Sequence, residues 1–272
     1  MKSSTRILIP GYPQADCVPP FPKTNYSNPR CYARELNDCG GPISREHYIS
    51  ENALKLWSVD NFVLTNFFDL ENDRLAPLKT NNFGANILCK RHNEALSSLD
   101  EIGGNFCSFV KDGKTDKQID VINGSDVERW FLKIFLGQSI IYYERKLGKK
   151  NWQPPRQLLE NLFFGKPFDK GIGLYTFVFN NLANFVNALG YSYISDKETN
   201  EGVGINFNIE GIEFFFGIKE PPSIPNNPNL AICYHPSQLV IIENSSKREL
   251  FTGWVNGEII TFNKDKWFIL PS

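Results

Sequence analysis

The spacing of apolar residues changes along the chain and divides it into three parts. Residues 1–30 are rich in Pro and polar residues, which predicts an irregular arm. From about residue 50 to residue 190 apolar positions recur mostly at three- and four-residue intervals, which is typical of helices. Beyond residue 200 short apolar runs alternate with turn residues, which is typical of strands. The pattern predicts an α+β protein whose helices precede a C-terminal antiparallel sheet.

The helical part contains several predicted helices with recognisable ends. SENALKLW is expected to be a short helix with Ser50 as its N-cap, and the stretch from Cys89 to about Val110 a longer one weakened at Gly103-Gly104. A long helix is expected to open with a capping box from Ser125 to Glu128. Two further helices are predicted at 154–165, starting at a proline, and at 174–190.

The predicted strands are short and are bounded by turn signals. Residues 61–68 alternate loosely, and a short strand is expected before Gly124. Residues 204–218 read as two strands joined at Glu210-Gly211. Further strands are expected at 230–235, 238–244 and 254–262, the last with an Asn-Gly turn signal.

Composition narrows the cellular setting. The chain has 272 residues, a hydrophobic content of 41% and a net charge of -1, so contact with nucleic acid or anionic lipid requires a local patch. There is no apolar run of about 18 residues and no signal-peptide pattern at the start, so we expect a cytoplasmic protein without a membrane partner. Thiols stay reduced in that compartment, and clustered cysteines there indicate metal binding.

Two pairs of residues form a candidate zinc site. Cys31 and Cys39 are separated by seven residues, and Cys89 and His92 lie about fifty residues later in CKRH. Three thiolates and one imidazole suit tetrahedral Zn2+, and a three-residue offset at a helix start brings two side chains to one side. The alternatives are that these cysteines merely pack in the interior, or that Cys17 competes as a ligand.

A Glu-His dipeptide lies between the two pairs. On the strand-like stretch ISREHYIS, Glu46 and His47 are expected to point to opposite faces. Asn93 follows the last candidate zinc ligand and projects from the same first helical turn. A Glu-His dipeptide on a strand is more often a surface feature than a catalytic pair, and the flanking cysteine pairs are what favour a site here.

The combination CGGPISREHYIS … NILCKRHNEALS resembles the zinc-knuckle branch of the HNH, or His-Me finger, endonucleases over roughly residues 31–100. That resemblance implies a zinc-stapled ββα-metal module in which two strands and a helix clasp one divalent cation. We therefore expect an arm at 1–30, an HNH-like module at 31–112, and a region at 113–272 that is helical and then β, of unknown role.

The resemblance also implies residue roles. His47 matches the general base that activates water, Asn93 a ligand of the catalytic cation, and Glu46 the acidic residue that helps hold that cation. The bracing Asn matches poorly, and Asn86 and Asn82 compete for it. Cys31, Cys39, Cys89 and His92 match the structural zinc ligands. The catalytic cation is expected to be Mg2+ or Mn2+.

The chain departs from the family pattern at two points. The family's Pro after His-x-Ile is a serine here, in HYIS, and the connection between the two halves of the motif is long.

Basic residues near these motifs are the candidate nucleic-acid contacts. Lys90 and Arg91 adjoin the site, while Lys149, Lys150 and Arg156 gather around a tryptophan. Solvated cations at a helix end are an equally good reading of the second group.

Three function hypotheses remain open at this point. The first is a divalent-metal-dependent endonuclease acting on nucleic acid, with DNA as the expected substrate. The second is a zinc-stabilised, inactive HNH-like module that binds nucleic acid or protein. The third is a structural or interaction protein with a coincidental cysteine set.

Overall fold

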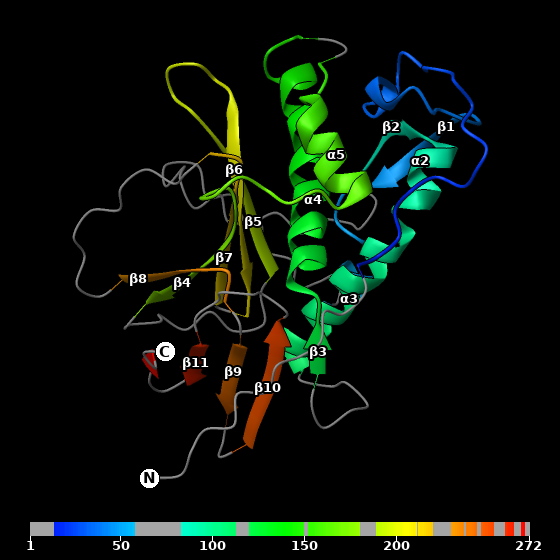
Figure 1. Cartoon of the computed structure of the whole chain (residues 1–272). Helices are drawn as coiled ribbons and strands as arrows, with labels where there is room; N and C mark the ends of the chain where they lie inside the picture. Colours follow the sequence, from blue (N-terminus) through cyan, green and yellow to red (C-terminus); the bar gives the residue numbers. More distant parts are fainter. Residues whose placement is uncertain are drawn as a thin grey trace.

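The computed structural model places a long central helix, α4 (Gly124–Arg145), between a small hairpin-and-helix unit and a five-stranded sheet (Figure 1). The described residues are 14–57, 83–112, 120–149, 152–179, 189–210, 212–219, 230–236, 238–243, 246–252, 259–263 and 268–269. The fold is thus mixed helix and sheet, as predicted.

The N-terminal unit contains a pair of strands followed by a helix. Strand β1 (Ile43–His47) pairs antiparallel with β2 (Gly84–Cys89), which runs directly into α2 (Lys90–Ala95). The pairing places Ile43 opposite Cys89 and His47 opposite Gly84, with an irregular register in between. The unit also includes η1 (Arg34–Leu36) and the short helix α1 (Glu51–Leu54), whose N-cap is Ser50 as predicted.

The single helix predicted from Cys89 to Val110 is two helices in the structure. α2 ends at its C-cap Leu96, and α3 (Ser97–Asp112) begins at the next residue, where the Ser97 hydroxyl donates to the Glu94 carbonyl at 2.8 Å. The predicted weak point at Gly103-Gly104 lies instead within continuous helix. A Cβ at Gly103 would lie 2.2 Å from the indole of Trp130, so this glycine permits the close crossing of α3 and α4.

Helix α4 follows β3 (Asp120–Ile122), and its predicted capping box is wrong. Asn123 is the N-cap, and its side chain accepts the Asp126 N–H at 3.3 Å. The Glu128 carboxylate, expected to reach back to the cap, accepts the Leu174 N–H at 2.7 Å. The observed cap, Asn123, lies one position before the first helical residue, whereas the predicted cap, Ser125, lies one position after it. Helix α5 (Arg156–Phe164) begins after Pro155, as predicted.

Two sheets have five strands each, and the one with the longer strands, called the larger sheet below, is antiparallel throughout. Its strand order is β5-β6-β7-β4-β8. Its strands are β4 (Gly173–Phe179), β5 (Leu189–Ser195), β6 (Gly202–Ile209), β7 (Ile212–Gly217) and β8 (Leu230–Tyr234). The helix predicted over 174–190 is therefore wrong where this range is described, because residues 174–179 belong to β4 and residues 189–190 to β5. β4 pairs on both sides, with β7 and β8, and its aromatic and β-branched residues suit such a central strand.

A second sheet has the order β12-β11-β9-β10-β3. It contains β9 (Gln238–Glu243), β10 (Ser246–Thr252), β11 (Ile259–Asn263) and β12 (Phe268–Ile269). The β10–β3 and β11–β9 pairs are parallel, so this sheet is mixed, against the prediction of a purely antiparallel C-terminal region. The strand predicted at 61–68 and the turn at Asn256-Gly257 lie outside the described residues.

Aromatic side chains join α3, α4 and the larger sheet in one core. Phe106 of α3 packs on Phe214 of β7 with ring centroids 5.2 Å apart, and Trp130 and Phe131 of α4 both contact Phe207 of β6. All five rings are at most 1% exposed. Among the described helices, none has the length and apolarity needed to cross a membrane.

Candidate metal centre and the strand that carries His47

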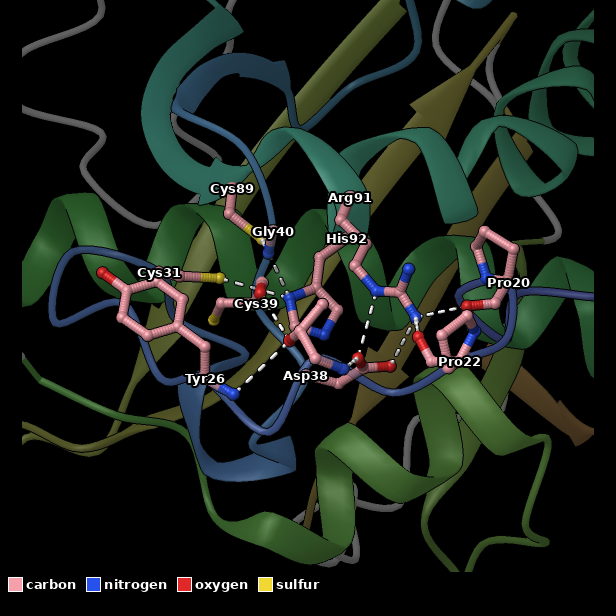
Figure 2. Close-up of polar contacts among 11 residues, drawn as sticks. Pro20, Pro22, Tyr26, Cys31, Asp38, Cys39, Gly40, Cys89, Arg91 and His92 are labelled. Carbon is pink, nitrogen blue, oxygen red and sulfur yellow. Dashed lines mark hydrogen bonds and ion pairs between the residues drawn. The ribbon is translucent and has the colours of Figure 1, made fainter.

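Four residues distant in sequence converge beside the hairpin, and all four are buried (Figure 2). They are Cys31, Cys39, Cys89 and His92. Their ligand atoms lie within 4.8 Å of one another, and His92 Nδ1 is 3.2 Å from the Cys89 sulfur and 3.5 Å from the Cys31 sulfur. The four residues predicted from their spacing as zinc ligands thus form a cluster that could hold a metal ion.

The donor set fits zinc. Tetrahedral Zn2+ with bonds of about 2.0–2.3 Å places its ligand atoms roughly 3.3–3.8 Å apart, close to the spacing found here. The cysteines are free thiols, so no disulfide accounts for their convergence. Hydrogen bonding from Cys31, and then from Cys39, lowers the pKa of Cys89, whereas that of Cys31 is raised by Cys39 and Cys89. One sulfur of the cluster is therefore predisposed to be a thiolate, the form that binds metal.

Backbone contacts fix the cluster to the hairpin. The Gly40 N–H donates to the Cys89 sulfur at 3.4 Å, as expected for a sulfur that carries negative charge. The first amides of α2 donate to the preceding loop, from Lys90 to the Pro42 carbonyl at 2.8 Å and from Arg91 to the Gly40 carbonyl at 3.1 Å. The start of α2 and the loop before β1 are consequently held together around the four ligands.

Arg91, predicted to contact nucleic acid, is used inside the protein. Its Nε and Nη2 lie 3.1 Å from the two carboxylate oxygens of Asp38, and Nη2 also donates to the Pro20 and Pro22 carbonyls of the arm (Figure 2). The Arg91 side chain is only 15% exposed. This bidentate pair ties the arm to α2, so Arg91 is better explained as a structural residue than as a phosphate contact.

The other predicted cations are at the surface. Lys90 pairs with Glu94 at 3.6 Å and Arg156 with Glu160 at 3.0 Å, both with the lysine or arginine more than half exposed. Lys149 lies 5.8 Å from the centroid of the Tyr143 ring. Lys150 falls outside the described residues.

Glu46 and His47 lie on opposite faces of β1, as predicted, with different surroundings. Glu46 is 2% exposed, its carboxylate lies 2.6 Å from the Lys133 ammonium, and burial raises its pKa to about 7. His47 is half-buried, and burial lowers its pKa. The interior position of Glu46 and its partner on α4 do not favour its predicted role as a ligand of a catalytic cation.

Lys133 joins Glu46 to a larger buried network that the sequence did not indicate. Its ammonium also contacts the Asp100 carboxylate and donates to the His47 carbonyl at 3.0 Å. Asp100 accepts the Ser50 hydroxyl, which in turn accepts the Trp130 indole N–H at 2.7 Å. The end of β1, the start of α1, and helices α3 and α4 therefore share one polar network.

The two predicted asparagines have different positions. The amide nitrogen of Asn93 donates to the Ser44 hydroxyl at 3.1 Å and to the Arg45 carbonyl at 3.4 Å, so Asn93 lies against β1. Asn86 is exposed on β2 and makes no described contact that would brace β1. The structure thus brings Asn93, but not Asn86, to the strand that carries His47.

Arg45 is a surface residue beside His47 that the sequence argument missed. Its side chain crosses Gly84, the pairing partner of His47, so closely that a Cβ at Gly84 would lie 2.7 Å from Arg45 Nε. The signal was available in ISREHYIS, since residues two apart on a strand share a face. Arg45 and His47 do so, with buried Glu46 between them.

The remaining cysteines and the third histidine are not part of the cluster. The Cys17 sulfur is 3.4 Å from the Ser98 hydroxyl, and Cys107 and Cys233 are buried. His235 Nε2 is 3.0 Å from the buried Glu128 carboxylate.

No family model, curated protein or solved structure matches the chain.

Proposed function

We propose that the protein is a divalent-metal-dependent endonuclease of the HNH type, which hydrolyses phosphodiester bonds of nucleic acid with His47 as general base. The observation that carries the proposal is the order of the elements around the metal cluster. An antiparallel pair, β1–β2, leads directly into α2, the cluster lies where Ile43 pairs with Cys89, and His47 occupies the far end of β1. This order of elements supports the ββα-metal module that the resemblance implies.

The metal of the cluster is a structural zinc in this proposal. Four protein ligands close the coordination shell and leave no position for water or substrate, so the zinc stabilises the hairpin without taking part in the reaction. Buried ligands contributed by two loops, a strand end and a helix support this role.

Asn93 supplies a ligand for the catalytic Mg2+ or Mn2+. Its amide nitrogen is the atom that donates to the Arg45 carbonyl, which leaves Oδ1 as the ligand atom, and both cations prefer oxygen. Bound cation would stabilise the charge that develops on the phosphate in the transition state. Glu46 is retained as the internal counter-ion of Lys133.

The surroundings of His47 support its proposed role as a general base. Burial lowers its pKa, which favours the neutral imidazole at neutral pH, the form that accepts a proton from water. The Lys133 ammonium donates to its backbone carbonyl, so the backbone at His47 is anchored from the side of α4.

A plasmid-nicking assay with His47→Ala tests the proposal. Zinc-loaded protein is incubated with supercoiled DNA, and separately with RNA, in Mg2+ or Mn2+. We expect the wild type to cut at least one substrate and His47→Ala to be slower by about 10²-fold or more. The matched control is Lys55→Ala, which replaces the exposed C-cap residue of α1. Equal cleavage by His47→Ala and wild type, with equal zinc content, would contradict the proposal.

A binding module without catalysis is the second candidate. The specific observation that favours it is Glu46, which the family pattern places at the cation but which is buried against Lys133 here. Binding of nucleic acid by zinc-loaded protein, with no cleavage of DNA or RNA in either cation, would select this function.

A further inference from the structure

The exposed apolar side chains of the protein gather on the N-terminal arm. Among the described residues four large apolar side chains are exposed, and three of them, Val18, Phe21 and Tyr26, lie in one short stretch of the arm. The Phe21 ring is 90% exposed. A single exposed apolar residue needs no explanation, but several in one segment indicate an interaction surface.

Arg91 holds the backbone on both sides of Phe21. Its Nη2 donates to the Pro20 carbonyl and, at 3.1 Å, to the Pro22 carbonyl (Figure 2). Arg91 is fixed in turn by the two carboxylate oxygens of Asp38, each at 3.1 Å. The exposed ring of Phe21 is therefore carried by backbone that a largely buried ion pair anchors to the start of α2.

The backbone at Tyr26 is anchored beside the metal cluster. The Tyr26 carbonyl accepts the Cys39 N–H at 2.7 Å. Thr24 donates through its N–H to Asp38 Oδ1 at 2.9 Å and through its hydroxyl to the Cys39 carbonyl at 2.6 Å. The segment between the two aromatic residues is thus fastened to the loop that supplies a metal ligand, while both rings remain at the surface.

The charges of this segment are all positive. Residues 18–30 contain Lys23 and Arg30 and no acidic residue, and the nearest acids along the chain are Asp16 and Glu35. Both cations are exposed, and neither takes part in the ion pairs of the described residues. Charge complementarity therefore favours an anionic partner.

Exposed rings that alternate with cations suit single-stranded nucleic acid. Bases stack on aromatic side chains while cations bind the phosphates, and a duplex would hide the base faces. A protein partner would be favoured by a continuous apolar patch, whereas exposed polar residues, Thr24 and Asn25, separate the two rings here.

We propose that residues 18–30 bind a single strand of nucleic acid, with bases stacked on Phe21 and Tyr26 and phosphates bound by Lys23 and Arg30. The inference rests on the proposed function for the class of partner. It adds a binding surface at the metal-cluster end of β1, whereas His47 lies at the other end. At most about 18 Å of chain separates Phe21 from Tyr26, so a strand of a few nucleotides can reach both.

Fluorescence anisotropy with a labelled single strand of about 12 nucleotides, as DNA and as RNA, tests the inference. The protein is zinc-saturated His47→Ala without Mg2+ or Mn2+, so the strand stays intact. Phe21→Ala and Tyr26→Ala should each weaken binding by about 5-fold to 100-fold, because a stacked base is lost. Phe21→Leu should lose as much and Phe21→Tyr should retain the affinity, since stacking requires a ring. A duplex of the same sequence should bind more weakly than the single strand.

Salt dependence tests the two cations separately. Lys23→Gln and Arg30→Gln should each weaken binding and reduce the slope of log affinity against log salt by about 0.7, the value for one phosphate of a single strand. Phe21→Ala should leave the slope unchanged because it removes no phosphate contact. The matched control is Lys197→Gln, which removes an exposed charge from the loop between β5 and β6 and should change neither affinity nor slope.

Cleavage by the His47-containing protein separates this inference from the proposed function. If His47-dependent cleavage is found but Phe21→Ala binds like the wild type, the arm is not the binding surface and the proposed function stands. If the arm variants lose binding while neither DNA nor RNA is cut, the inference stands and the endonuclease proposal fails. Equal affinity of Phe21→Leu and wild type, or no binding of any single strand, would overturn the inference.

Discussion

Lys133 holds the strand end of His47 from inside the protein, and Lys133→Met is the substitution that measures this contact. The ammonium lies 2.6 Å from Glu46, contacts Asp100, and donates to the His47 carbonyl, in a side chain that is 1% exposed. Methionine retains most of the length of the aliphatic stem and removes the charge. What remains is the Glu46 carboxyl group, in a side chain that is 3% exposed and has lost its cation.

The expected loss is large because the pair is buried. Removing one partner of a buried ion pair costs about 3–5 kcal/mol, whereas exposed pairs contribute about 0–1 kcal/mol. The chain contains a matched exposed pair, Lys55 with Glu51 at 2.9 Å, whose side chains are 64% and 50% exposed. Lys55→Met should therefore lower the free energy of unfolding by less than about 1 kcal/mol.

Urea unfolding of zinc-saturated protein, followed by tryptophan fluorescence, measures both losses. The double variant Lys133→Met/Glu46→Gln should recover part of the loss, because it replaces a buried acid that has lost its cation by a neutral amide. Asp100 keeps access to water, with 28% of its side chain exposed. The reasoning is refuted if Lys133→Met costs no more than Lys55→Met, or if the double variant is no more stable than Lys133→Met alone.

Three further predictions concern other parts of the molecule. Burial raises the pKa of Glu213 above 4.5, so the contribution of Glu213 to stability falls as pH rises above that value. In denaturant titrations, Glu213→Gln should have the same free energy of unfolding as the wild type near pH 4 and a higher one at neutral pH. Cys39→Ser should reduce bound zinc from one ion per chain toward none by elemental analysis, whereas Cys107→Ser, in the core but outside the cluster, should retain it. Gly103→Ala should lower the melting temperature although alanine favours helix, since its Cβ would meet an indole at 2.2 Å, and Gly104→Ala, with its nearest neighbour at 3.0 Å, should lower it less.

Sequence spacing was most informative for the metal-ligand candidates, because the binding of one metal ion accounts for four residues at once. The four metal-ligand candidates are so restricted in type and offset that the cluster could be predicted from spacing. Helix α5 and the β6–β7 hairpin were also predicted, because Pro155 and the Glu210-Gly211 turn are strong local signals.

The errors arose where distant contacts decide the structure. Residues 173–179 have apolar spacing compatible with a helix, and only their pairing with β7 and β8 makes them a strand. Glu46 has a family-like place in the sequence, but Lys133, 87 residues later, sets its environment. Glu128 likewise satisfies an N–H of β4 instead of its own helix start. No window of local sequence contains these partners.

The position of His47 depends on two supports at opposite ends of one short strand. β1 has five residues in a two-stranded sheet, a unit that is marginally stable alone. The metal cluster holds its beginning, where Ile43 pairs with Cys89, while α4 holds its end through Lys133 and through Tyr48 packed on Gly137. About 13 Å of strand separates these supports. Because neither one fixes both ends, loss of a metal ion bound by the cluster, or of the Lys133 contact, should each displace His47, even though neither touches its imidazole.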